Sequence, residues 1–106
     1  MKIYISGKIT GIPFEEFVLK FNNAACFLLS LDYEPINPLT ISPHHENKTW
    51  EDYMLNDIKA LFECEAIYML NDWKDSKGAR IEHAIAKELS LKIIYQTEIK
   101  TETTSN

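Results

Sequence analysis

Asp57 is an acidic residue placed where a carboxylate could take part in chemistry. It lies three residues after Met54 and four residues before Leu61, on the apolar side of the helix that is predicted to follow Thr49. A carboxylate on that side is costly unless it is paired or reaches into a pocket. The pattern therefore allows two interpretations: a pocket carboxylate, or an acidic residue at the edge of the apolar stripe that is hydrogen-bonded or wetted.

Glu82 is the best candidate for a nucleophile. It falls in the first or second turn of a helix that is predicted to begin near Ser76, where the positive end of the helix dipole favours an ionised carboxylate. Such a carboxylate at the rim of a cleft can attack an anomeric carbon. A capping box does not explain Glu82, because the residue three positions after Ser76 is Ala79, whose side chain cannot accept a hydrogen bond from the backbone N–H of Ser76. A solvent-facing glutamate that merely suits the dipole is the alternative.

The turn after the first predicted strand has the composition of an anion-binding loop. Its two glycines, four residues apart, allow a tight turn and a close approach of the backbone to a ligand. Exposed N–H groups, a lysine and two hydroxyls before a helix N-terminus would suit a phosphate. The loop matches neither the P-loop nor the dinucleotide-binding fingerprint, so an ordinary strand-to-helix turn is the alternative. The residues concerned are Ser6, Gly7, Lys8, Ile9, Thr10 and Gly11.

The loop before the third predicted helix offers further ligand contacts. Ser76 is a natural N-cap, and Gly78 is small enough for the helix start to press against a ligand or a neighbouring strand. Trp73 could stack on a base or could cover the core. Elsewhere, the adjacent His44 and His45 lack a nearby set of carboxylates, so we expect neither a metal nor another cofactor.

Predicted strands and helices alternate along the chain and would position these residues. Strands are predicted at residues 2–6, 33–36, 66–70 and 92–95, with helices between them and a loop at 39–48. This order predicts a flavodoxin-like or Rossmann-like three-layer α/β sandwich with a mostly parallel sheet of four or five strands. Ligands of such sheets bind beyond the carboxyl ends of the strands. One domain is expected at residues 1–96, followed by a polar, flexible tail at 97–106.

The composition excludes several classes of function. The 106-residue chain has a net charge of −5, whereas binding to a nucleic-acid backbone needs a basic face, so no nucleic-acid partner is expected. No apolar run approaches the roughly 18 residues of a membrane span, and the N-terminus does not resemble a signal peptide. We therefore expect a cytoplasmic protein without a membrane partner. Cys26 and Cys64 lie in apolar segments outside any CxxC pair and are predicted to be buried thiols.

Three segments together resemble the nucleoside 2-deoxyribosyltransferase superfamily, and most closely its small uncharacterised phage and bacterial domains. They are YISGKITG at 4–11, LNDI at 55–58 and DSKGARIEHA at 75–84, in that order, and together they span most of residues 2–95. The likeness to enzymes of proven activity is patchier. The spacing between Asp57 and Glu82 is nevertheless close to theirs.

The resemblance implies an enzyme that acts on the N-glycosidic bond of a nucleoside or nucleotide, as a hydrolase or a deoxyribosyltransferase. Glu82 would be the nucleophile, Asp57 would hold the sugar or assist departure of the base, and Tyr4 would orient the nucleophile. Ser76 and the loop at residues 6–11 correspond to segments that receive the 5′-phosphate in related deoxynucleotide N-hydrolases. The implied chemistry is double displacement through a glycosyl ester.

Two features depart from the family pattern. Lys8 and Thr10 stand where the phosphate-binding branch has a serine and an arginine. In the active family a C-terminal segment of a neighbouring subunit completes the site, which implies a homodimer or a higher homo-oligomer, but here only a short polar tail follows Tyr95. Either another part of the dimer supplies the missing group, or the site binds without catalysing. The alternatives to an enzyme are a non-catalytic sensor of a nucleotide-derived ligand and a plain interaction domain.

Overall fold

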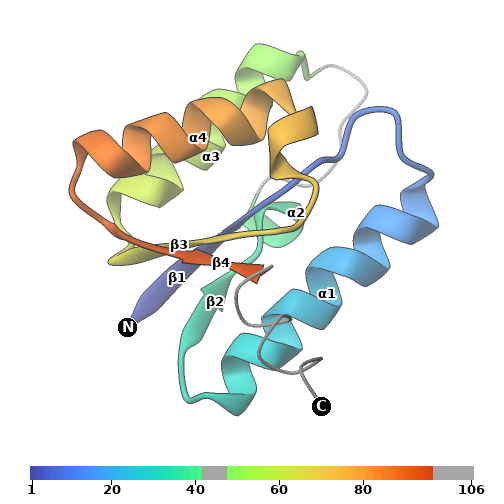
Figure 1. Cartoon of the computed structure of the whole chain (residues 1–106). Coiled ribbons are helices and arrows are strands. Elements are labelled where there is room, and N and C mark those ends of the chain that lie inside the picture. The colour runs from blue at the N-terminus through green and yellow to red at the C-terminus, as the bar shows by residue number, and fades with distance from the viewer. Residues whose placement is uncertain (42–47, 97–106) are drawn as a thin grey trace.

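The computed structural model describes residues 1–41 and 48–96, in which one parallel sheet carries helices on both faces (Figure 1). Its elements are β1 (Lys2–Ser6), α1 (Phe14–Ser30), β2 (Glu34–Ile36), α2 (Pro38–Ile41), α3 (Trp50–Phe62), β3 (Ala66–Met69), η1 (Trp73–Asp75), α4 (Lys77–Glu88) and β4 (Lys92–Tyr95). The predicted three-layer α/β fold is confirmed, with four strands in the described residues. The predicted tail at 97–106 and the pair His44 and His45 lie outside those residues.

The strand order β2-β1-β3-β4 places a topological switch point between β1 and β3. The chain leaves β1 towards β2 on one side, and it returns through α3 to β3 on the other side. The two central strands are in register to their ends, with Ser6 opposite Met69. The loops that follow them therefore start side by side, at the edge where such sheets bind ligands.

The two faces of the sheet bury different residues because side chains alternate along each strand. Ile3 and Ile5 of β1 pack with Phe21 and Leu28 beneath α1. Tyr4 packs on the opposite face, in the cluster covered by α3 and α4. The alternation of β1 thus turns Tyr4 towards α3 and α4, the two helices that carry Asp57 and Glu82.

Two local predictions need correction. The short helix α2 overlaps the start of the segment predicted as a loop at residues 39–48, because its four residues are too few to show a period. Just before it, the side chain of Asn37 accepts the N–H of Leu39 over 3.0 Å. Cys26 is exposed, so its prediction as a buried thiol was wrong, whereas Cys64 is buried. The buried residues of α1 are Phe21, Ala24 and Leu28; Cys26 falls two positions after Ala24, away from that stripe.

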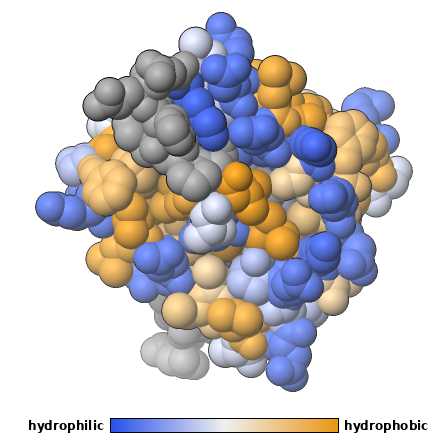
Figure 2. All heavy atoms as spheres, turned by 180° about the vertical axis from the view of Figure 1, so that it is seen from behind, coloured by the Kyte–Doolittle hydropathy of each residue, from blue (hydrophilic) through white to orange (hydrophobic). Residues whose placement is uncertain are grey.

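The surface of the molecule is mixed in character. On the face seen in Figure 2, hydrophobic side chains are interspersed with hydrophilic ones. Within residues 1–41 and 48–96, no helix is both long enough and apolar enough to cross a membrane.

Gly7→Ala is expected to destabilise the protein by about 1–3 kcal/mol, because overpacking forces backbone shifts. A Cβ at Gly7 would lie 2.7 Å from Cδ1 and 2.9 Å from Cβ of Leu70, and the Cβ of Leu70 cannot move away by a change of rotamer. Thermal unfolding measures the effect. Thr10→Ala, at an exposed position of the same loop, is the control; equal melting temperatures for the two variants would contradict this close packing.

Candidate active site

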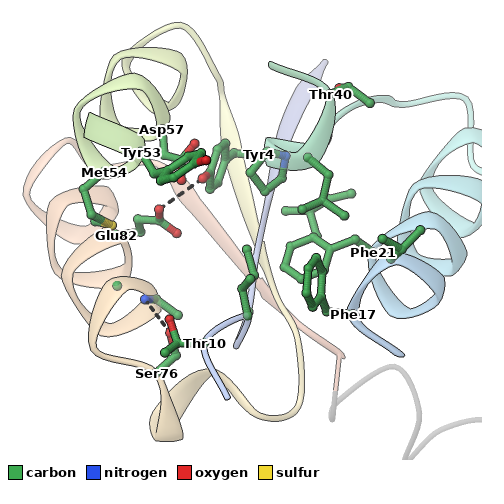
Figure 3. Close-up of a pocket in the computed structure, with 18 of the residues that line it drawn as sticks. Tyr4, Thr10, Phe17, Phe21, Thr40, Tyr53, Met54, Asp57, Ser76 and Glu82 are labelled. Atoms are coloured by element: carbon green, nitrogen blue, oxygen red, sulfur yellow. Dashed lines mark hydrogen bonds between the residues drawn. The ribbon is translucent and has the colours of Figure 1, made fainter. Parts of the chain in front are cut away.

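A cavity of about 680 Å³ opens at the carboxyl end of the sheet and is walled by α1, α2, α3 and α4 (Figure 3). It is lined by Tyr4, Ile5, Gly7, Ile9, Thr10, Phe14, Phe17, Val18, Phe21, Asn22, Pro38, Leu39, Thr40, Trp50, Tyr53, Met54, Asp57, Ser76, Gly78, Ala79 and Glu82. Asp57 and Glu82 thus share one pocket, although they come from different helices and lie 25 positions apart in the chain.

Glu82 is held by one hydrogen bond on each carboxylate oxygen. The Ser6 hydroxyl donates to Oε1 over 2.7 Å, and the Tyr4 hydroxyl donates to Oε2 over 3.0 Å. Glu82 is only 4% exposed, because it lies on the inner side of α4 with Ala79 and Ala86. Ser6 was predicted to belong to a phosphate-binding loop, but its hydroxyl is committed to Glu82. The carboxylate is therefore fixed in position before any ligand binds.

The start of α4 brings Glu82 to the pocket. Ser76 caps the helix as predicted, since its Oγ accepts the N–H of Ala79 over 3.1 Å. Both Ser76 and Gly78 line the pocket. A Cβ at Gly78 would lie 3.0 Å from Sδ of Met54, so the small residue lets α4 approach α3 closely.

Asp57 has a buried oxygen without a hydrogen-bond partner. Its side chain is on the inner face of α3 with Met54 and Leu61, and it is 8% exposed. The Oδ1 atom makes no hydrogen bond within the described part of the chain. Figure 3 shows the carboxylate next to Tyr4 and Tyr53 at the same side of the cavity as Glu82. Buried polar atoms are nearly always paired, so this atom points to a bound ligand or water.

Burial raises the proton affinity of both carboxyls. Loss of solvent raises the pKa of Asp57 from its ordinary value of 3.8 to about 7, against the lowering effects of the Tyr4 hydroxyl and the Lys48 charge. The same cause raises the pKa of Glu82 to about 8; the hydroxyl of Ser6 lowers it, the charge of Asp57 raises it further, and the hydroxyl of Tyr4 lowers it. Protonation of Asp57 therefore makes Glu82 easier to ionise. Near neutral pH the pair can supply both an acid and a base.

The first loop contributes to the pocket in part. Gly7, Ile9 and Thr10 line the cavity, whereas Lys8 and Gly11 are not among the lining residues. The backbone N–H of Lys8 donates to Oδ1 of Asp72 over 3.0 Å, so it is already engaged by an internal carboxylate. Gly11 has a φ of +83°, a conformation that glycine adopts without strain.

Lys20 and Asp72 hold this loop in place, and the sequence reasoning did not single them out. Nζ of Lys20 donates to the carbonyl oxygen of Lys8 over 2.8 Å and also forms an ion pair with Asp72. Asp72 follows β3 and Lys20 lies on α1. Only the folded chain brings them together, so no local pattern could have revealed the pair.

The pocket also contains aromatic residues of α1 and α3 that were not predicted as site residues. Phe14 and Phe17 stand in the first turns of α1, and Trp50 and Tyr53 stand one to two turns before Asp57 on α3. Phe14 is 66% exposed and Trp50 is 39% exposed, which places them at the rim. Their position immediately after a candidate ligand loop, or just before a candidate carboxylate, was the signal that could have identified them.

Two lysines bring positive charge to this rim. Nζ of Lys77 lies 4.9 Å from the ring centre of Trp50, and Nζ of Lys48 lies 5.4 Å from that of Tyr53. Trp73 does not line the cavity; it stacks on His83 with a centroid distance of 4.2 Å. In the described ranges there is no group of three His, Cys, Asp or Glu residues that could hold a metal ion.

Fold and pocket together define a flavodoxin-like α/β domain with a buried acid pair at its switch point. The chain belongs to the family described as Domain of unknown function (DUF4406), whose model matches residues 1–95. A solved structure of 2-deoxyribosyltransferase from the psychrotolerant bacterium Bacillus psychrosaccharolyticus is similar, with a TM-score of 0.69 and 17% sequence identity over 90% of this chain and 71% of that chain. No curated protein sequence matches the chain. The predicted resemblance to the 2-deoxyribosyltransferases is thus confirmed at the level of the fold.

Proposed function

We propose that the protein cleaves the N-glycosidic bond of a nucleoside or nucleotide, with Glu82 as the nucleophile. The observation that carries this proposal is the arrangement around Glu82. Each of its carboxylate oxygens accepts a hydroxyl from β1, and Asp57, whose Oδ1 atom has no hydrogen-bond partner within the described residues, lines the same pocket. The fold shared with 2-deoxyribosyltransferase supports the same chemistry.

In the first step an ionised Glu82 oxygen attacks the anomeric carbon, and the bond from this carbon to the base nitrogen breaks. The bonding electrons leave with the base, which needs a proton as it departs. Asp57 supplies that proton, because burial raises its pKa and favours its protonated form, while the hydroxyls of Ser6 and Tyr4 favour the ionised form of Glu82. The product is a glycosyl ester of Glu82 and a free base.

In the second step water or another base attacks the anomeric carbon of the ester, and Glu82 leaves as a carboxylate. Asp57, now ionised, takes the proton from the attacking group. Tyr4 and Ser6 act as positioning residues, because their hydroxyls stabilise the carboxylate in both its initial and its released state. Burial raises the pKa of Tyr4 well above its ordinary value, so it stays a neutral donor.

The choice between a nucleoside and a nucleotide depends on the rim of the pocket. Lys48 and Lys77 lie over rim aromatic rings, where a phosphate could meet them, whereas the N–H of Lys8 is engaged by Asp72. The proposal therefore includes both substrate classes. We also propose that the protein forms a homodimer or a higher homo-oligomer, as members of the superfamily that it resembles do.

The test is incubation of the protein with ribo- and deoxyribonucleosides and their 5′-monophosphates, with chromatography of the released base. We expect free base from at least one class, and exchange of the base when a second base is added if the protein is a transferase. Saturable binding without release across the panel would support the non-catalytic sensor instead. Absence of both binding and release would support an interaction domain.

A further inference from the structure

Asn22 and Asn37 form a hydrogen-bonded pair at the wall of the pocket that faces Glu82. Asn22 lies on α1 and lines the cavity, and Asn37 lies just before α2, where it is 6% exposed. Nδ2 of Asn37 donates to Oδ1 of Asn22 over 3.2 Å. Figure 3 shows Phe21 and Thr40, from the same two helices, across the cavity from Glu82.

A backbone group determines how both amides are turned. The N–H of Leu39 can only donate, and it donates to Oδ1 of Asn37 over 3.0 Å. Asn37 must therefore turn its Nδ2 towards Asn22, and the Oδ1 of Asn22 must accept this hydrogen bond. The polar group that remains on Asn22 is Nδ2, on a side chain that is exposed and lines the cavity. Asn22 thus offers the pocket a hydrogen-bond donor.

We propose that Asn22 is a specificity-determining residue that donates to the base of the substrate. It would select bases with a carbonyl oxygen at the contacted edge, such as an oxopurine or an oxopyrimidine, over the corresponding amino bases. This inference rests on the proposed function: with the anomeric carbon at Glu82, the base extends towards the wall formed by α1. The partly exposed ring of Phe17 lines that wall and suits a planar base.

Asn37 acts as a positioning residue for this donor. In Asn37→Asp one carboxylate oxygen can still accept the N–H of Leu39, but the other becomes an acceptor facing Asn22. The amide of Asn22 must then turn over, so that it donates to Asp and presents its oxygen to the pocket. A change behind the wall would thereby convert the pocket donor into an acceptor without changing a lining residue.

The test is calorimetric titration of inosine against adenosine and of uridine against cytidine, in a Glu82→Gln background that keeps the ligands intact. We expect the oxo member of each pair to bind about tenfold more tightly, as one lost hydrogen bond implies. Asn22→Asp and Asn37→Asp should each reverse or abolish this ratio. Asn23→Asp is the matched control, because Asn23 is an exposed neighbour on α1 that does not line the cavity.

The outcomes separate this inference from the proposed function. An unchanged ratio in both Asn22→Asp and Asn37→Asp, or no binding of any of the four nucleosides, overturns the role of Asn22. If the unmodified protein releases base, but the ratio of its affinities for oxo and amino nucleosides does not change in Asn22→Asp, this inference alone is overturned. The expected ratio and its reversal, without any release of base, support this inference and count against the glycosidic reaction.

Discussion

Glu82→Gln is expected to lower the rate of base release by roughly 10³-fold or more, as removal of a covalent nucleophile does. Glutamine keeps the shape of the side chain, and its Oε1 can still accept one of the two hydroxyls of Ser6 and Tyr4, while the other hydroxyl can turn to accept from its Nε2. Its amide cannot form the glycosyl ester. The loss should therefore appear in kcat, with a much smaller change in binding of the intact substrate. Chromatography of free base under single-turnover conditions measures it.

Glu88→Gln is the matched control for this variant. Glu88 lies on the same helix, but it is exposed and outside the cavity, so its replacement should leave base release unchanged. Thermal unfolding of both variants shows whether the fold is kept. Activity of Glu82→Gln within tenfold of the unmodified protein would rule out Glu82 as the nucleophile.

The acid pair is expected to make the protein less stable as the pH rises from about 4 to about 8. Both carboxyls have a raised pKa in the folded protein, about 7 for Asp57 and about 8 for Glu82, against 3.8 and 4.5 ordinarily. At a pH well below 3.8 both are protonated whether the chain is folded or not. At higher pH the unfolded chain loses these protons first, so unfolding becomes more favourable until the folded groups ionise as well.

The size of this effect follows from the change in proton affinity. Each tenfold change is worth about 1.4 kcal/mol, so the loss for each buried carboxyl is on the order of a few kcal/mol. The double variant Asp57→Asn with Glu82→Gln cannot ionise at either position. Its gain in unfolding free energy over the unmodified protein should therefore grow between pH 5 and pH 8.

Urea unfolding at several pH values measures this difference. The control is the double variant Glu51→Gln with Glu88→Gln, which removes one exposed carboxylate from each of the same two helices. Its difference from the unmodified protein should stay nearly constant with pH. If the Asp57 and Glu82 double variant behaves in the same way, the two carboxyls are not buried together.

The helices and strands were largely predictable because their signals are local. The apolar stripe of α1, the capping box formed by Thr49 and Asp52, and the cap at Ser76 are each readable within a few residues, and each is present. The four residues of α2 carry no period and were missed. Cys26 was misjudged because an apolar neighbourhood in sequence does not define which side of a helix is buried.

The sequence by itself determined the alternation of elements, the acidic residue types at positions 57 and 82, and the glycine turn that precedes α1. The contacts that give these residues chemistry depend on the sheet order. Tyr4 and Ser6 meet Glu82 only because β1 lies beside β3 and turns alternate side chains towards α4. Two further contacts likewise join segments that are distant in the chain: the ion pair of Lys20 with Asp72 and the hydrogen bond between Asn22 and Asn37. Spacing along a sequence carries no information on such contacts, because they arise from the packing of helices and strands against one another.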